Sequence, residues 1–349
     1  MADPYHALSK GLEIDGYEIV RVLGSGGFGI TYLGFDTNLD KAVAIKEYMP
    51  SDLAVRKGDT TVIPKSDNDL PDFNWGLERF LDEARILARF DHKNIVKVHR
   101  FFKAHGTAYI VMEYVEGETL SNFFKRSPNL TYSTLSKVVT PVLEGLRLVH
   151  ESNFLHRDIK PGNVIIREDE VPVLIDFGAA RQAVGAKSRS VTAIVTPGYA
   201  PIEQYSSRGK QGPWTDIYAL GAICYKAITG NLPIDATERV RKDPHIKLID
   251  AQVPKSLGYP KSYLQAIDRA LEVEEEDRPQ SVNELIEYLS ESSETLDENI
   301  KTTKVEPIHR SPTNLSSPSN QISTSNRKPI LYGAVALGVI AVVLSLIHI

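Results

Sequence analysis

The stretch HRDIKPGNVIIREDEVPVLIDFG, residues 156–178, sets charged and amide side chains between short apolar runs. The side chains there that could do chemistry belong to Asp158, Lys160, Asn163 and Asp176. Carboxylate and amide oxygens suit hard cations such as Mg²⁺, and an ammonium group attracts anions. The segment VIIREDEVPVLI predicts two short strands around an acidic turn, which would bring Asn163 and Asp176 to one edge. A salt-bridged surface loop is the alternative interpretation of this stretch taken alone.

The segment LGSGGFGITYLG contains the pattern Gly-x-Gly-x-x-Gly at Gly24, Gly26 and Gly29. A dinucleotide-binding fingerprint would need a helix after the glycines and an acidic residue about 20 positions later. A strand pattern, ITYLGFD, follows instead, and no Walker A sequence occurs in the chain. A bare glycine turn is another interpretation. A strand–turn–strand hairpin can also offer backbone N–H groups to phosphates, because glycine leaves room for close approach.

Lys46 ends the strand-like segment VAIK, seventeen residues after the glycines. A neighbouring strand would carry this lysine near the glycine turn, where its charge could hold phosphate oxygens. An ordered lysine there needs an anion. Glu83 in FLDEARIL is the best candidate, with Asp82 and Glu78 as alternatives on the same predicted helix. An ordinary surface position for Glu83 is the competing interpretation.

These segments occur in an order that resembles one family. The motifs GSGGFG, VAIK, HRDIKPGN, DFG and TPGYAPIEQY, followed by TDIYALG and DRP, resemble those of a eukaryotic-type (Hanks-type) serine/threonine protein kinase of the sort found in bacteria. The resemblance covers about residues 17–290. It implies ATP and Mg²⁺, or Mn²⁺, as cofactors, protein substrates with serine or threonine acceptors, and phosphoryl transfer as the reaction.

The resemblance also implies roles for single residues. Asp158 matches the catalytic aspartate that orients the acceptor hydroxyl and accepts its proton, and Lys160 matches the lysine that steadies the γ-phosphate. Asn163 and Asp176 match the metal ligands. The implied nucleotide-binding residues are Leu23, Gly24, Ser25, Gly26, Gly27, Phe28, Gly29, Thr31, Lys46, Glu83, Glu113 and Val115.

Further matches concern support and regulation. Met112 stands at the gatekeeper position, and Glu113 to Val115 would offer backbone groups to adenine. Arg157 would bind a phosphorylated activation loop. That loop would run from residue 176 to 203, with Ser188, Ser190 and Thr192 as candidate autophosphorylation sites. A homodimer could serve autophosphorylation in trans.

Three more matches fall in the second half of the chain. Thr196 matches the substrate-loop threonine, in a structural more than a regulatory role. Asp216 would bond to the backbone of the catalytic loop. Arg278 would pair with Glu203, although the segment APIE has one residue more than the usual pattern.

Two other features depart from the family pattern. Thr31 stands where a valine usually packs on adenine. Thirty-seven positions separate Lys46 from Glu83, far more than the family usually needs. The extra residues, about 47–77, would form a docking or regulatory insert, or else a tolerated surface loop.

The pattern of elements predicts an α+β, bilobal protein-kinase fold with a C-terminal single transmembrane helix. YEIVRVLG, GITYLGFD and KAVAIKEY predict strands, and IVKVHRFFKAHGTAYIVMEYV predicts two more around a turn at residues 105–106. GLERFLDEARILARF, TYSTLSKVVTPVLEGLRLVHESN and SYLQAIDRALEVEE have helical spacing. The predicted organisation is an N-terminal extension (1–16), a kinase domain (17–291) with an N-lobe (17–115) and a C-lobe (116–291), a linker (292–328) and the membrane helix (329–347).

Composition sets the remaining limits. The net charge of -5 and pI near 6.0 speak against a generic nucleic-acid binder. One cysteine, Cys224, excludes an internal disulfide. Residues 292–328 are rich in Ser, Thr, Asn and Pro, which predicts a disordered linker. Residues 329–347 carry no charge, and the preceding Arg327 and Lys328 favour a single-pass protein of the inner membrane with the kinase domain in the cytoplasm.

Two other function classes share features with this sequence. A pseudokinase would act as a binding scaffold with the same fold, but it normally lacks the lysine, the catalytic aspartate or the metal-binding aspartate, all present here. A nucleotide-dependent oxidoreductase has only the glycine run in its favour.

Overall fold

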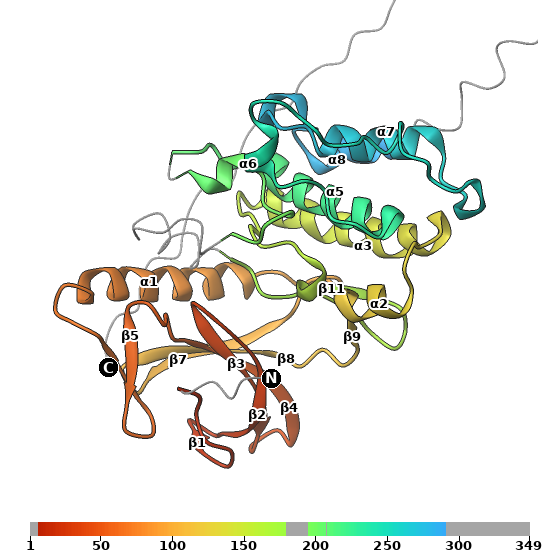
Figure 1. Cartoon of the computed structure of the whole chain (residues 1–349). Coiled ribbons are helices and arrows are strands. Elements are labelled where there is room, and N and C mark those ends of the chain that lie inside the picture. Colours follow the sequence, from red (N-terminus) through yellow and green to blue (C-terminus); the bar gives the residue numbers. More distant parts are fainter. Residues whose placement is uncertain (1–5, 179–194, 207, 291–349) are drawn as a thin grey trace, which may run out of the picture. The chain divides into compact units, whose positions relative to one another are not determined.

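The first half of the described chain is built on an antiparallel sheet (Figure 1). The computed structural model describes residues 6–178, 195–206 and 208–290. Six strands pair in the order β1-β2-β3-β4-β8-β7, with bounds Glu13–Ile14 (β1), Tyr17–Gly26 (β2), Gly29–Asp36 (β3), Lys41–Tyr48 (β4), Val98–Ala104 (β7) and Thr107–Glu113 (β8). All five predicted strands are confirmed, including the turn at residues 105–106.

Alternation along β3 shows why the sheet forms here. Buried and half-buried side chains alternate along the whole strand, because one of its faces packs inside the lobe. Gly29 faces the neighbouring strand so closely that a β-carbon would collide with the carbonyl oxygen of Glu47. The first residue of β3 must therefore be glycine for β3 and β4 to pair at this point.

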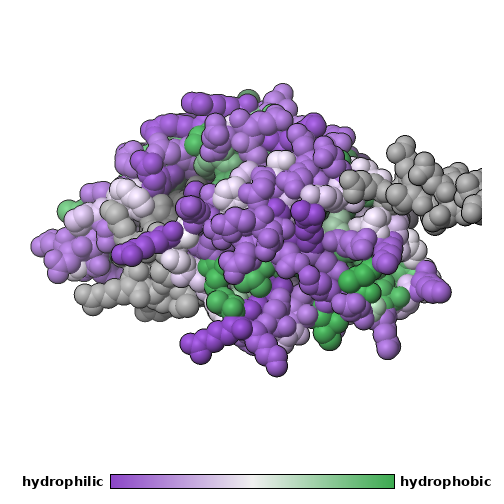
Figure 2. Space-filling view, turned by 90° about the horizontal axis from the view of Figure 1, so that it is seen from above, coloured by the Kyte–Doolittle hydropathy of each residue, from purple (hydrophilic) through white to green (hydrophobic). Residues whose placement is uncertain are grey.

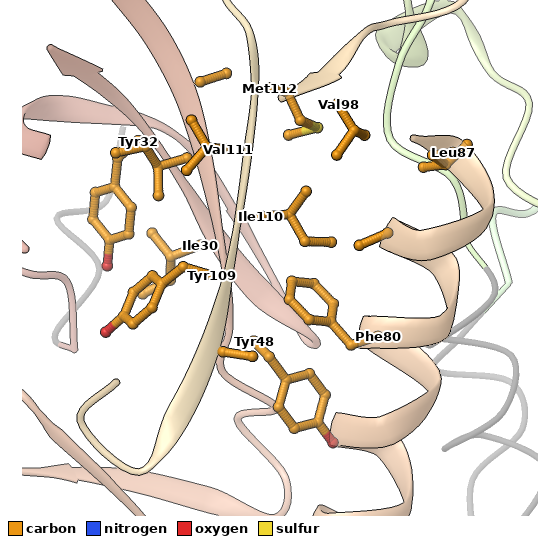
Figure 3. Close-up of a cluster of buried hydrophobic side chains, with 14 of the residues drawn as sticks. Ile30, Tyr32, Tyr48, Phe80, Leu87, Val98, Tyr109, Ile110, Val111 and Met112 are labelled. Atoms are coloured by element: carbon orange, nitrogen blue, oxygen red, sulfur yellow. The ribbon is translucent and has the colours of Figure 1, made fainter. Parts of the chain in front are cut away.

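Helix α1 (Leu70–Leu87) packs against one face of this sheet. Its apolar residues recur at helical spacing, and Figure 3 shows Phe80 and Leu87 pointing toward Ile110 of β8 and Val98 of β7. The predicted helix is confirmed, but it begins at Leu70, well inside the segment that the sequence assigns to an insert. A proline in the first turn suits that start, because the first helical N–H groups need no partner within the helix.

The insert and the N-terminal segment are both ordered parts of the N-lobe. Between β4 and α1, the strands β5 (Ala54–Lys57) and β6 (Thr61–Pro64) form a separate two-stranded hairpin. Before β2, strand β1 pairs with it, and Leu8 is buried. Residues 6–16, predicted as an extension, thus contribute to the sheet and to its hydrophobic cluster.

The second half is mainly helical and forms its own hydrophobic cluster. Its α-helices are α2 (Leu120–Arg126), α3 (Tyr132–Glu151), α5 (Pro213–Thr229), α6 (Ala236–Arg239), α7 (Lys261–Ala270) and α8 (Val282–Ser290). Short 3-10 turns lie at Pro161–Asn163, Ile202–Tyr205, Lys255–Leu257 and Glu275–Asp277. Nearly every residue of α5 is buried, so α5 is the centre around which α3, α7 and α8 pack.

A small sheet carries the residues after the catalytic stretch. Strands β10 (Val164–Ile166) and β11 (Pro172–Leu174) pair with each other, and β10 also pairs with β9 (Glu118–Thr119). The hairpin predicted from VIIREDEVPVLI is therefore confirmed. In Figure 1 the hairpin lies beside α2.

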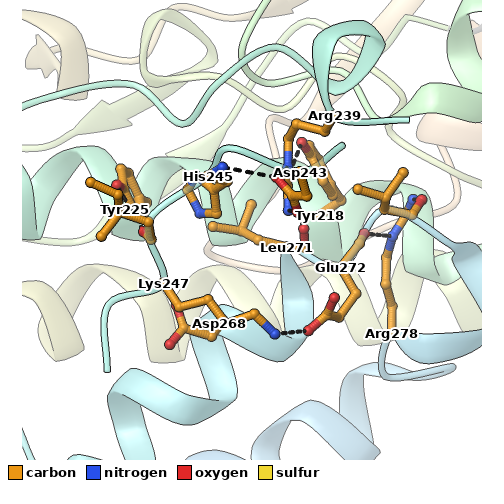
Figure 4. A network of polar contacts seen from close by, with 12 residues as sticks. Tyr218, Tyr225, Arg239, Asp243, His245, Lys247, Asp268, Leu271, Glu272 and Arg278 are labelled. Carbon is orange, nitrogen blue, oxygen red and sulfur yellow. Dashed lines mark hydrogen bonds and ion pairs between the residues drawn. The ribbon is translucent and has the colours of Figure 1, made fainter. Parts of the chain in front are cut away.

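Two ion pairs stabilise the helical lobe, and Figure 4 shows the one between Arg239 and Asp243. Arg278 Nη1 and Nη2 lie 2.8 Å and 3.2 Å from the two carboxylate oxygens of Glu203. The predicted Glu203–Arg278 pair is therefore confirmed despite the extra residue in APIE. Arg239 forms a second pair with Asp243 at 2.7 Å and donates to the carbonyl oxygen of Leu271.

The predicted linker (292–328) and membrane helix (329–347) lie outside the described residues, so both stay predictions. Within the three ranges that the structure describes, no helix has the length and apolarity that crossing a bilayer demands. On the face shown in Figure 2, hydrophilic residues predominate and apolar ones gather in small separate groups.

Candidate active site

Lys46 points from β4 to two carboxylates. Its Nζ lies 2.6 Å from Asp176 Oδ1 and 3.4 Å from Glu83 Oε1, so the structure forms the predicted Lys46–Glu83 pair. Burial alone would lower the pKa of Lys46, but the charges of Asp176 and Glu83 outweigh it and raise that pKa. Partial desolvation likewise opposes ionisation of Asp176, yet Lys46 holds its pKa below the usual value. The lysine is thus firmly cationic.

Asp158 is the centre of a second group of polar side chains. Its Oδ2 accepts from Lys160 Nζ at 2.7 Å and from Asn163 Nδ2 at 3.0 Å. Its Oδ1 accepts from the hydroxyl of Thr196 at 3.1 Å. Asn163 Nδ2 also lies 3.4 Å from the carbonyl oxygen of Asp176, so the two groups adjoin.

Asp216, at the first turn of α5, holds the backbone before Asp158. Its carboxylate accepts from the N–H of His156 at 2.8 Å, from the N–H of Arg157 at 2.7 Å and from Nε2 of His150 at 2.8 Å. The predicted bonding of Asp216 to the catalytic-loop backbone is therefore confirmed. Burial would raise its pKa, but the hydrogen bond from His150 and the neighbouring donors lower it, so Asp216 is ionised.

Arg157 and Asp176 both adopt left-handed backbone conformations, with φ of 65° and 60°. Such strain persists only where surrounding contacts enforce it. Asp216 enforces it at Arg157, and the bond from the N–H of Gly178 to the carbonyl oxygen of His156, 2.9 Å long, enforces it after Asp176.

A cavity of ≈ 340 Å³ opens between the glycine turn and the catalytic loop. It is lined by Gly24, Ser25, Gly26, Gly27, Phe28, Gly29, Thr31, Lys46, Phe80, Asp158, Lys160, Asp176, Phe177 and Gly178. A β-carbon placed on Gly24, Gly26 or Gly27 would meet no protein atom within 4 Å, so packing does not demand glycine there. Space that side chains would fill is instead left open toward the cavity.

Most of the predicted nucleotide-binding residues line this cavity, but four do not. Glu83 lies behind Lys46, and Leu23, Glu113 and Val115 lie outside its lining. The N–H of Glu113 donates to the carbonyl oxygen of Lys97 at 2.8 Å, so this N–H already has a partner within the protein. The cavity therefore corresponds to the phosphate end of the predicted site.

The site also includes residues that the sequence motifs did not indicate, and the predicted phosphorylation sites are not among the described residues. Ser188, Ser190 and Thr192 lie outside the described residues. Phe80, Phe177 and Gly178 line the cavity without having been singled out. His150 was also missed: it lies in the last turn of α3, 66 positions from its partner Asp216, so only the fold brings them together.

Comparison with known proteins agrees with this geometry. The protein kinase domain family matches residues 17–290. Serine/threonine-protein kinase D of Synechocystis sp. is 32% identical over 292 residues, which are 79% of this chain and 52% of that protein. Serine/threonine-protein kinase PknA of Nostoc sp. is 31% identical over 284 residues, 78% of this chain and 46% of that protein. The chain thus spans about half the length of these curated relatives.

Two solved structures are similar. The apo form of PpkA-294 superposes with a TM-score of 0.74 and 38% identity, covering 81% of this chain and 99% of that one. Rad53 residues 1–466, solved with AMP-PNP, is similar in fold alone, with a TM-score of 0.56, 20% identity, and 78% and 65% of the two chains covered. The family match, the two-lobed architecture and the convergence of Lys46, Asp158, Asn163 and Asp176 show that the chain belongs to the protein kinase family, among the Hanks-type serine/threonine kinases of bacteria.

Proposed function

We propose that this chain transfers the γ-phosphoryl group of ATP to serine and threonine hydroxyls of proteins. The observation that carries the proposal is one cavity whose lining combines the glycine turn with Lys46, Asp158, Lys160 and Asp176. Phosphoryl transfer needs positioning and positive charge more than covalent help. The cavity supplies both.

Each charged residue of the cavity would have a different role in the transfer. Lys46, kept cationic by its two carboxylates, is placed to hold phosphate oxygens below the glycine turn. Asp158 is placed to orient an acceptor hydroxyl and take its proton, as its Oδ1 already accepts a bond from the hydroxyl of Thr196. Lys160, 2.7 Å from Asp158, would bring positive charge to the group in transfer.

Asn163 and Asp176 fit a divalent cation. Because Asn163 Nδ2 donates to Asp158, the amide oxygen is the atom left to bind a cation, and the Asp176 carboxylate is 45% exposed and ionised. Oxygen donors of this kind suit Mg²⁺ or Mn²⁺. A bound cation would neutralise charge on the phosphates.

Arg157 supports regulation by phosphorylation. Its guanidinium Nε is buried with no hydrogen-bond partner among the residues that the structure describes, and burial lowers its pKa. A buried guanidinium favours an anionic partner, and a phosphate binds it bidentately. We infer autophosphorylation at Ser188, Ser190 or Thr192, in trans within a homodimer.

We also propose that the chain is anchored in the inner membrane by residues 329–347, with the kinase domain in the cytoplasm. The support is the uncharged run itself and the basic pair Arg327 and Lys328 before it. Membrane fractionation of cells that express the whole chain, with a variant ending at residue 328 as control, tests this. Recovery of both forms in the soluble fraction would reject it.

The decisive experiment on catalysis compares the whole chain with Asp158→Asn. Purified in detergent with Mg²⁺ and radiolabelled ATP, the wild type should label itself and a generic protein acceptor on serine and threonine. Asp158→Asn should lose nearly all turnover while its circular dichroism and its affinity for AMP-PNP stay the same. Equal turnover in the two proteins would overturn the assignment.

A further inference from the structure

The residues that directly follow β4 are hydrogen-bonded to the tip of the glycine turn. The N–H of Met49 donates to the carbonyl oxygen of Phe28 at 3.2 Å, and the N–H of Ser51 donates to that of Gly27 at 2.9 Å. Ser51 Oγ also lies 3.3 Å from the Gly27 oxygen. Gly27 and Phe28 are the two residues that join β2 to β3, so the turn is held from outside its own hairpin.

Arg56 anchors the β5–β6 hairpin to the sheet. Its Nη2 lies 2.6 Å from Glu47 Oε2, and neither side chain is more than 4% exposed. Its Nε and Nη1 donate to the carbonyl oxygens of His6 and Thr60, each at 2.6 Å. One guanidinium therefore joins β4, the hairpin and the N-terminal segment.

Glu47 is held by two tyrosines as well. The hydroxyl of Tyr32 donates to Oε2 at 2.8 Å, and that of Tyr109 to Oε1 at 2.9 Å. In Figure 3 both rings lie on the opposite side of the sheet from Phe80. A buried carboxylate is stable only when donors fill its lone pairs, and three donors do so here.

Tyr48 connects the same segment to α1. Its ring centroid lies 5.3 Å from that of Phe73 and 5.5 Å from that of Phe80, and its hydroxyl donates to the carbonyl oxygen of Phe73 at 3.2 Å. The hydroxyl of Thr107 in β8 donates to the Tyr48 carbonyl oxygen. Residues 48–69 therefore contact the glycine turn, the sheet and α1 together.

We propose that residues 48–69 form a brace that holds the glycine turn ready for the phosphates of ATP, with the N–H of Ser51 and the guanidinium of Arg56 as its positioning groups. The proposal rests on the function proposed above, because ATP is the ligand that the turn receives. Four of the six residues 24–29 are glycines, so the backbone of the turn would otherwise be free to move. Ordering a loop on binding weakens affinity, and a loop ordered in advance avoids that loss.

Ser51 allows a matched test of the bond to the turn. The N–H groups of Leu53 and Ala54 both donate to the carbonyl oxygen of Pro50, so Ser51 is the second residue of a turn, where proline is favoured. Ser51 is exposed. Ser51→Pro removes the N–H and the hydroxyl, and its ring carbon would occupy the space between this nitrogen and the Gly27 oxygen, so the bond to the turn cannot form. Ser51→Ala removes the hydroxyl only.

In Ser51→Pro we expect the KM for ATP and the Kd for AMP-PNP to rise about three- to tenfold, the range that loss of one hydrogen bond gives. The kcat and the KM for the protein acceptor should stay within about twofold of the wild-type values. In Ser51→Ala the kcat, both KM values and the Kd for AMP-PNP should all stay within that range. Hydrogen exchange of the peptide covering residues 24–29, measured without nucleotide, should be faster in Ser51→Pro than in Ser51→Ala. Equal constants and equal exchange in the two variants would overturn the brace.

Arg56 is tested in the double variant Glu47→Gln with Arg56→Met, which leaves no unpaired charge in the lobe. We expect the same selective rise in the KM for ATP and faster exchange at residues 24–29. Asp243→Asn breaks an ion pair in the other lobe and serves as the control for general destabilisation. Asp243→Asn should lower the melting temperature without changing the KM for ATP or the hydrogen exchange of residues 24–29. If Asp243→Asn and the double variant changed these two quantities equally, Arg56 would have only a structural role.

The two proposals fail differently. A wild-type chain that neither binds AMP-PNP nor phosphorylates protein would remove the proposed function. Hydrogen exchange at residues 24–29 is measured without nucleotide, so it would still support or overturn the brace in that case. If Ser51→Pro does not fold, the double variant of Glu47 and Arg56 provides the same measurement.

Discussion

Lys46 Nζ lies closer to Asp176 than to Glu83, at 2.6 Å and 3.4 Å. The lysine therefore links the sheet, through its own strand, to the segment after β11 and to α1. Glu83 is 1% exposed at its side chain and Asp176 is 45% exposed. The exposed partner can turn toward a ligand, whereas the buried one stays to hold the lysine.

Lys46→Met should abolish efficient catalysis and reduce stability. Loss of one preorganised charge at a reacting group lowers the rate by about 100-fold or more. The buried Glu83 carboxylate would lose its cation, which destabilises by about 3 kcal/mol. Steady-state kinetics and urea unfolding measure the two effects. The double variant Lys46→Met with Glu83→Gln should recover much of the stability but none of the activity, and recovery of activity would contradict the role of Lys46.

Thr196→Val should lower kcat by up to about tenfold, because Asp158 loses the hydroxyl that donates to its Oδ1. AMP-PNP binding should not change, since Thr196 does not line the cavity below the glycine turn. Thr196→Ser keeps the hydroxyl and is the matched control. If Thr196→Val and Thr196→Ser had the same kcat, the hydrogen bond would have no part in catalysis.

Arg278→Met should destabilise the protein by about 3–5 kcal/mol, because it leaves the buried Glu203 carboxylate without a cation. The double variant with Glu203→Gln should be less destabilised than Arg278→Met alone. Urea unfolding of the wild type, the two single variants and the double variant forms a cycle that measures the coupling. Strict additivity of the two changes would show that the pair contributes nothing.

Acid should destabilise the fold partly through Asp216. Its pKa is lowered in the folded protein, against about 3.9 in an unfolded chain. At low pH the unfolded state therefore binds a proton more readily than the native state does. The contribution of Asp216 to the unfolding free energy is thus fully present above about pH 4 and is lost as the pH falls through the pKa of Asp216 in the folded protein. Asp216→Asn should flatten the decline of unfolding free energy with falling pH below about pH 4. An unchanged slope would rule out Asp216 as a source of acid sensitivity.

Removal of divalent cations should stop transfer. With EDTA in excess, labelling of the protein acceptor should cease, and Mg²⁺ or Mn²⁺ should restore it. Asn163→Ala should raise the Mg²⁺ concentration needed for half-maximal rate, because one oxygen ligand is lost. Full activity in EDTA would reject the metal site.

Local patterns in the sequence were enough for the strands β2, β3 and β4, for the hairpin β10–β11 and for the amphipathic faces of α1 and α3. The reason is that apolar residues recur every second position in a half-buried strand and every 3.6 positions in an amphipathic helix, so their spacing indicates the backbone conformation directly. The ordered motifs also indicated which side chains meet in the cleft, because Lys46, Asp158, Asn163 and Asp176 each sit beside a recognisable element. The pairing of Glu203 with Arg278 was likewise predicted from the motifs that contain them.

Only the tertiary structure decided what surrounds these residues. Glu47 and Arg56 look like surface charges in a sequence, yet the fold buries both against Tyr32 and Tyr109. Leu8 is part of the core although it precedes the family match. Whether a charged side chain is buried depends on which distant segments fold over it, and the spacing of nearby apolar residues in the sequence does not indicate this. The sequence by itself therefore determined the elements and the reacting groups, and the packing of distant segments determined how the glycine turn and the catalytic loop are held.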